Sequence, residues 1–242
     1  MKPNPKPNPT LYIAAAMFNG RETLFNSGLA DKLGCDIGWL TLPQRDGLEF
    51  TSLAESLSRR LSGEEAMIAV QNIIYSLDIG YLIPRSDIII ANLDEPPDEG
   101  VIAEMCYGRK LGKKIIGFRT DTRSPYGSLS DTFRGMHTFP AYQCDIFVSH
   151  YIQAKDRLSA EKEMDSLVQK LRVAIDELKP QITEGLPEYA LSDPNISRVL
   201  SIANLLFAGL ENLNTPASIS EIADRYIKNQ SEFEKQIPKV IF

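Results

Sequence analysis

Residues 87–93 read Asp-Ile-Ile-Ile-Ala-Asn-Leu and form the clearest strand in the sequence. Their unbroken apolar run is typical of a central parallel strand that is covered on both faces. Asp98 follows a proline-rich loop and is well placed to cap a helix over residues 99–111, which Gly112 ends. A further strand is expected over residues 114–118. This alternation of strand and helix predicts a parallel sheet.

The alternation extends outward on both sides of this centre, through about residue 150. It predicts an α/β fold with a doubly wound, flavodoxin- or Rossmann-like parallel sheet over residues 11–150. The remaining elements expected there are strands over residues 11–16, 35–40 and 145–149, helices over 21–33 and 64–82, and a loop over 41–53.

The two ends of the chain differ from this centre. Residues 1–10 alternate Pro with Asn or Lys, a composition that favours an extended, solvated tail. Helical stretches separated by prolines are expected over residues 155–179, 194–213 and 218–236. We therefore predict that residues 151–242 form a helical C-terminal region, either packed on the sheet domain or used for association.

Composition limits the partners and the compartment. The net charge of −6 argues against a nucleic acid partner, because binding the phosphate backbone needs clustered Lys and Arg. No apolar run approaches the ~20 residues that span a bilayer, and the N-terminus lacks the apolar core of a signal peptide. Cys35, Cys106 and Cys144 show no paired spacing, which suits a reducing cytoplasm. With only His137 and His150, no metal site is expected.

Acidic residues gather after the central strand. Asp98 and Gly100 lie just past its carboxyl end, the edge at which open α/β sheets bind ligands. Glu104 lies six residues beyond Asp98, and its side chain is expected to lean back towards the helix N-terminus. Asp98 and Glu104 could therefore face one cavity, and Gly100 would let a ligand approach the backbone closely.

A structural interpretation stays open for each acid. Asp98 alone is typical of a helix cap, and a lone glutamate such as Glu104 is typical of a solvated helix face. The mainly apolar neighbours of Glu104 fit that second interpretation poorly. Asp78 lies between two apolar residues near the end of the helix expected over 64–82, where it would form the polar edge of an amphipathic helix.

Several of these stretches together resemble a known family. They are Asp78, the strand at 87–93, Asp-Glu-Gly-Val-Ile-Ala-Glu at 98–104, Gly-Lys-Lys at 112–114, and the segments 12–18 and 118–123. This pattern resembles the nucleoside 2-deoxyribosyltransferases over roughly residues 11–150. The spacing of the acids is its most specific part, and residues 151–242 have no counterpart.

The resemblance implies roles for individual residues. In that family, the glutamate that matches Glu104 attacks the anomeric carbon of 2-deoxyribose. The aspartates that match Asp78 and Asp98 contact the substrate and help to deliver a proton to the leaving base, and the tyrosine that matches Tyr12 orients the nucleophile. For Tyr12, core packing is the alternative. The substrate-binding positions expected here are Phe18, Gln44, Gly100 and Asn92, and core packing is the alternative for Phe18 as well.

The chemistry agrees with this assignment and needs neither metal nor cofactor. A carboxylate can stabilise the cationic sugar and bond to it covalently. A second carboxyl group must carry a proton for the leaving base, and crowded acids raise at least one pKa. The family often completes its site from a neighbouring subunit, so the resemblance implies a homo-oligomer, with Met136 as a residue supplied in this way.

The predicted function is transfer of 2-deoxyribose between nucleobases, by cleavage of the N-glycosidic bond of 2'-deoxynucleosides through a covalent glycosyl-Glu104 intermediate with retention. One alternative is a 2'-deoxynucleoside 5'-monophosphate N-hydrolase. That enzyme needs a phosphate cradle; the loop at residues 16–21 is poor in Ser, but Arg21, Ser124 and Ser128 could bind an anion. The other alternative is a non-catalytic nucleotide sensor that uses residues 151–242 for output or assembly.

Overall fold

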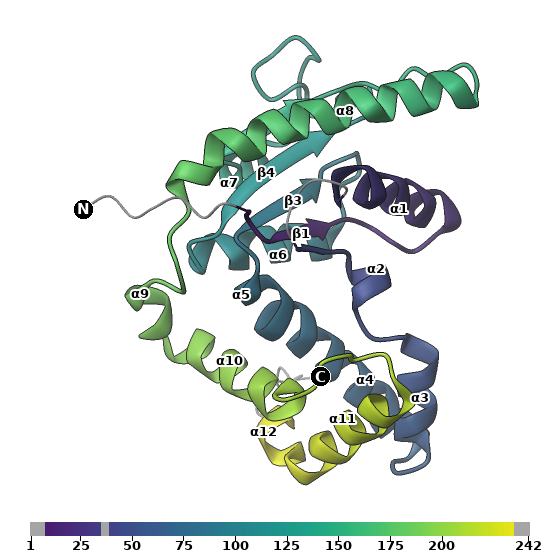
Figure 1. The fold of residues 1–242 in the computed structure, drawn as a ribbon, viewed down its shortest axis with the longest axis vertical. Coiled ribbons are helices and arrows are strands. Elements are labelled where there is room, and N and C mark those ends of the chain that lie inside the picture. The colour runs from purple at the N-terminus through teal and green to yellow at the C-terminus, as the bar shows by residue number, and fades with distance from the viewer. Residues whose placement is uncertain (1–7, 35–38, 235–242) are drawn as a thin grey trace. The chain divides into compact units, whose positions relative to one another are not determined.

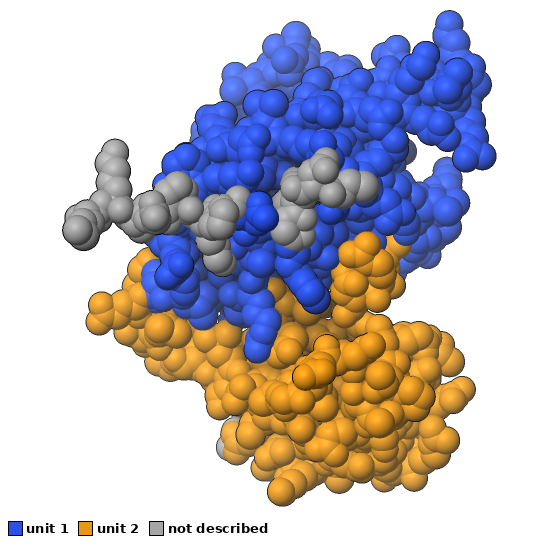
Figure 2. Space-filling view, viewed as in Figure 1, with its two compact units in different colours: residues 1–42, 83–187 blue, residues 43–82, 188–242 orange. Residues whose placement is uncertain are grey.

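The computed structural model describes residues 8–34 and 39–234. The chain divides into two compact units, each built from two separate stretches of sequence. Unit 1 comprises residues 1–42 and 83–187, and unit 2 comprises residues 43–82 and 188–242 (Figure 2). The division expected at residue 150 does not coincide with a boundary between these units, because residues 151–187 belong to unit 1.

Unit 1 contains the sheet, which is entirely parallel. Its order is β2-β1-β3-β4-β5, so the strand order reverses between β1 and β3, as in doubly wound folds. The predicted fold class is therefore confirmed. Most of the strand expected over 35–40 lies outside the described residues. The strands are β1 (Leu11–Ala14), β2 (Leu40–Thr41), β3 (Ile88–Asn92), β4 (Lys114–Arg119) and β5 (Ile146–Ser149).

Helices cover both faces of this sheet (Figure 1). On one face, α1 (Gly20–Gly34) and α8 (Arg157–Leu178) pack together over Ile88 and Ile90. On the other face lies α6 (Glu99–Lys110), where a Cβ at Gly108 would meet Ile89 Cδ1 at 2.1 Å. Ile89 points away from Ile88 and Ile90 because side chains alternate along a strand. Unit 1 also contains two short α-helices, α5 (Ile83–Arg85) and α7 (Thr138–Gln143).

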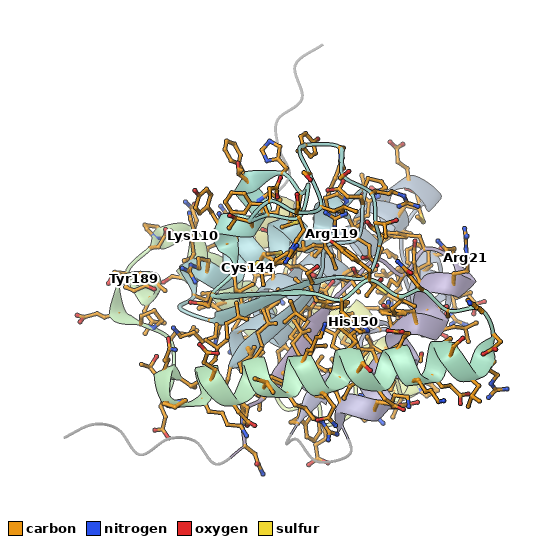
Figure 3. All side chains as sticks on the ribbon, turned by 90° about the horizontal axis from the view of Figure 1, so that it is seen from above. Arg21, Lys110, Arg119, Cys144, His150 and Tyr189 are labelled. Atoms are coloured by element: carbon orange, nitrogen blue, oxygen red, sulfur yellow. The ribbon has the colours of Figure 1, made fainter. Side chains whose placement is uncertain are left out.

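The long helix α8 is fixed to the end of β5 by a polar cluster around His150. His150 Nε2 lies 2.9 Å from Glu163 Oε2, and His150 Nδ1 lies 3.0 Å from Lys170 Nζ. Figure 3 labels His150 beside this helix. The first of the three helices expected after residue 150 thus packs on the sheet.

Unit 2 is entirely helical in its described part. The loop expected over residues 41–53 is wrong, because two helices begin within it. Pro43 is an ambiguous sequence signal, because proline favours both turns and the first position of a helix, and here it begins α2. The next helix is capped by Glu49, whose side chain accepts from Thr51 N and Ser52 N. The helices are α2 (Pro43–Asp46), α3 (Phe50–Ser58), α4 (Gly63–Leu77), α9 (Glu188–Leu191), α10 (Pro194–Phe207), α11 (Pro216–Lys228) and α12 (Gln230–Glu234).

The helix expected over 64–82 continues from α4 into a π-helical segment, η1 (Asp78–Leu82). Gly80 lets η1 approach α10, since a Cβ there would lie 2.6 Å from Ala203 Cβ. By length and composition alone, residues 63–85 could cross a membrane, contrary to the expectation that no run approaches that length. However, 56% of the apolar stretch is buried inside the protein, as in a core helix.

Candidate active site

A buried tyrosine holds the carboxylate of Glu104. Tyr12 is fully buried in β1, and its hydroxyl donates to Glu104 Oε1 over 2.6 Å. Tyr12 pairs in register with Ile89, so both side chains point to the face of the sheet that α6 covers. Glu104 lies in the second turn of α6 and is half-buried. The structure thus brings together the two residues expected to act as nucleophile and orienting group.

The N-terminus of α6 carries the second acid. Asp98 is the N-cap of this helix, and its Oδ1 accepts from Val101 N over 3.0 Å. The capping interpretation is therefore what the structure shows for this residue, and it fixes the direction of the carboxylate. Gly100 is exposed beside it, and a Cβ at this position would lie 2.9 Å from Asp98 Oδ1. A glycine thus keeps the space next to the carboxylate open.

Two further predicted binding residues lie at the same edge of the sheet. Asn92 ends β3, and its Oδ1 accepts from Asp94 N over 3.0 Å, so this side chain shapes the turn after the strand. Phe18 follows β1 and is 80% exposed. Core packing is therefore wrong for Phe18, whose ring is presented to solvent, whereas the ring of Tyr12 is buried.

Asp78 and Gln44 belong to unit 2, whereas the other predicted site residues belong to unit 1. Asp78 is the first residue of η1, and its backbone N–H bonds to the carbonyl groups of Ile74 and Tyr75. Burial raises the pKa of Asp78 from 3.8 to about 7. The cause is desolvation rather than the crowding of acids that was expected. Gln44 lies half-buried in α2.

Met136 does not fit the role of a residue offered to a neighbouring subunit. It lies in the loop before α7 and is only 2% exposed. Its backbone N–H donates to Phe133 O over 3.1 Å, within the same loop. Its own chain therefore already covers this side chain.

A clamp between two loops at the carboxyl edge was not predicted. Asp94 Oδ1 accepts from the backbone N–H groups of Thr120, over 2.6 Å, and Asp121, over 3.1 Å. The hydroxyl of Thr120 donates to Asp94 Oδ2 over 2.7 Å. Asp94 therefore ties the loop that leads to Asp98 to the start of the loop after β4. An acid directly after a strand was the only sequence signal for this contact.

Arg119 holds the rest of the loop after β4. Its guanidinium is fully buried and donates to Asp121 Oδ1 over 2.6 Å and to the carbonyl of Arg123 over 2.5 Å. Arg119 is labelled below this loop in Figure 3. Beside it, Glu95 is 6% exposed, and burial raises the pKa of its carboxyl group, a rise that the charge of Arg119 opposes. The contacts of Arg119 thus fix the start of the loop that follows β4 at the carboxyl edge of the sheet.

A family model described as nucleoside 2-deoxyribosyltransferase matches residues 11–171, about two thirds of the chain. The chain belongs to this family. The match extends beyond the residues 11–150 expected from the sequence and takes in most of α8. Membership implies an enzyme of the transferase or glycosidase type with nucleoside 2-deoxyribosyltransferase-like activity.

Two other comparisons add little to this assignment. No curated protein matches the chain. A solved structure, the sugar isomerase domain of an RpiR transcription factor from Sphaerobacter thermophilus, is similar at 13% identity and a TM-score of 0.34, over 72% of this chain and 73% of that chain. A likeness this weak bears on neither the mechanism nor the substrate.

Proposed function

We propose that the protein transfers 2-deoxyribose from one nucleobase to another, with Glu104 as the nucleophile. The observation that carries this proposal is the 2.6 Å bond from the buried Tyr12 hydroxyl to Glu104 Oε1. Glu104 lies on α6, the helix that Asp98 caps after the central strand β3, and Tyr12 lies in β1, the strand that pairs with β3. Ligands of doubly wound folds bind at this edge, next to the point where the strand order reverses.

The proposed reaction has two displacements at C1' of the sugar. A carboxylate oxygen of Glu104 attacks C1', the glycosidic C–N bond breaks, and the base leaves with a proton supplied by an acid. A nitrogen of the second base then attacks C1' of the glycosyl ester, releases the carboxylate and gives up its own proton. Two inversions at one carbon return the β-configuration.

Asp98 suits contact with the sugar or base, because it caps the helix that carries Glu104. Its cap bond to Val101 N holds its carboxyl group in one direction.

Incubation with deoxyadenosine and free cytosine tests the function directly. We expect deoxycytidine in the β-configuration and free adenine in equal amounts. Release of base and sugar without exchange would favour a hydrolase, and no release would favour a non-catalytic sensor. Adenosine should react far more slowly than deoxyadenosine, because a 2'-hydroxyl crowds the attacking carboxylate and destabilises the cationic sugar. Equal rates with both sugars would contradict the proposal.

Removal of the Tyr12 hydroxyl should slow the reaction without preventing it. A hydrogen bond to a charged group contributes about 1.5–3 kcal/mol, so Tyr12→Phe should lower kcat by roughly 10- to 100-fold. Tyr142→Phe is the matched control, because Tyr142 is 70% exposed on α7. Steady-state kcat with deoxyadenosine and cytosine is the measurement. A Tyr12→Phe enzyme as active as its control would mean that Tyr12 does not orient the nucleophile.

A further inference from the structure

A buried carboxyl group that the proposed reaction does not use lies in the loop between β3 and α6. Glu95 is only 6% exposed, although Pro96 beside it is exposed. Among the described residues, its Oε1 is buried and has no hydrogen-bond partner. An ionised carboxylate costs far more to bury in this way than a neutral carboxyl group does. The position of the side chain therefore favours the protonated form of Glu95.

The backbone around Glu95 joins two loops at the carboxyl edge of the sheet. Its N–H donates to Asp121 Oδ2, and Asp121 Oδ1 accepts from the buried guanidinium of Arg119 over 2.6 Å. The residue before it, Asp94, accepts from the backbone N–H groups of Thr120 and Asp121. Residues 94–95 are thus attached to the start of the loop after β4.

The charged groups around Glu95 do not compensate for its burial. Burial raises the pKa of its carboxyl group and is the largest influence on it. The charges of Arg119, Arg123 and His137 oppose this rise, and the charge of Asp121 adds to it. Arg119 pairs with Asp121, and within the described part of the chain its Nε has no hydrogen-bond partner. An ionised Glu95 would therefore gain free energy by leaving this position for water.

Movement of Glu95 would reach the helix that carries Glu104. Only Pro96 and Pro97 separate Glu95 from Asp98, the N-cap of α6. Because the proline rings fix φ, this connection is stiff, and a shift at residue 95 should be passed on to Asp98. The ionisation state of Glu95 is thereby connected to the start of α6.

We infer that Glu95 is a positioning residue that holds the loop before α6 against the loop after β4 while it is protonated, and releases it on ionisation. The folded protein binds this proton more tightly than the unfolded chain, so the contact is stable at acidic pH and is lost as the pH rises through the raised pKa of Glu95. The inference rests on the proposed function in one respect, because the release should displace Asp98 and slow base exchange.

Hydrogen exchange of the two loops tests the contact without catalysis. The measurement is the protection factor of peptides that cover residues 93–98 and 118–124, corrected for the intrinsic exchange rate at each pH. From pH 5 to pH 9, protection in the wild type should fall by at least about threefold, because only the released loop gains from ionisation. Glu95→Gln, and Glu95→Met as a second uncharged variant of similar size, should not show this fall. The matched control is Glu99→Gln, an exposed residue in the first turn of α6, which should behave as the wild type does.

The kcat/KM of the wild type divided by that of Glu95→Gln tests the consequence for the reaction. With deoxyadenosine and cytosine, this ratio should be close to unity at pH 5 and should fall by at least about threefold by pH 9. Asp78 and Glu104 are present in both proteins, so their own titration cancels in the ratio.

Several outcomes would each overturn the inference. Protection that depends equally on pH in the wild type and in both Glu95 variants would show that the proton of Glu95 does not hold the loops. Lower protection in both variants at pH 5 and at pH 9 would show that an ionised Glu95 pairs with a cation such as Arg119. A kcat/KM ratio that is constant with pH, with protection as expected, would show that the contact does not position Asp98. If no deoxynucleoside reacts at any pH, the proposed function fails, whereas hydrogen exchange still decides whether Glu95 holds the loops.

Discussion

Glu104→Gln should lower kcat for base exchange by a factor on the order of a thousand or more, the loss that follows removal of a covalent nucleophile. An amide oxygen can still accept the bond from Tyr12, so the variant should keep the local packing while losing the ability to form the glycosyl ester. Steady-state exchange between deoxyadenosine and cytosine is the measurement, with urea unfolding to verify that stability is retained.

Glu99→Gln is the matched control for this variant. Glu99 lies in the first turn of the same helix and is exposed. Its replacement should leave kcat near the wild-type value. A Glu104→Gln enzyme that keeps more than about a tenth of the wild-type kcat would have lost less than about 1.4 kcal/mol of transition-state stabilisation. That result would remove Glu104 as the nucleophile.

The buried carboxyl group of Asp78 should make the stability of the protein depend on pH. Its pKa is about 7 in the folded protein against a reference value of 3.8, so the folded state holds the proton more tightly. The stabilisation is fully present below about pH 4 and is lost as the pH rises through about 7. Asp78→Asn should therefore be more stable than the wild type at pH 8, by an amount on the order of a few kcal/mol.

Urea unfolding at pH 5 and pH 8 measures this difference. The advantage of Asp78→Asn should shrink at pH 5, where the wild-type carboxyl group is mostly protonated. An advantage of equal size at both pH values would show that burial does not raise the pKa of Asp78.

The centre of the fold could be predicted because its signals are local. The apolar run at residues 87–93 predicts a strand that is buried on both faces, and Asp98 is a typical N-cap for the helix that follows.

The arrangement of unit 2 could not be predicted, because distant residues define it. Asn214 Oδ1 accepts from Glu49 N over 2.9 Å, and Arg60 pairs with Asp224 over 2.8 Å. These partners lie more than 160 residues apart, and nothing in the local sequence connects them. The clamp at Asp94 was missed for a similar reason, since its partners follow a different strand.

The covalent intermediate on Glu104 is the central claim, and mass spectrometry of the protein after incubation with a 2'-fluoro-2'-deoxynucleoside tests it most directly. The fluorine slows breakdown of the glycosyl ester, because it destabilises the cationic transition state, so the intermediate should accumulate. We predict one added fluorosugar on the peptide that contains Glu104, absent in Glu104→Gln and released when a free base is added. A fluorosugar attached to another residue, or exchange that gives a product of inverted configuration, would contradict the account.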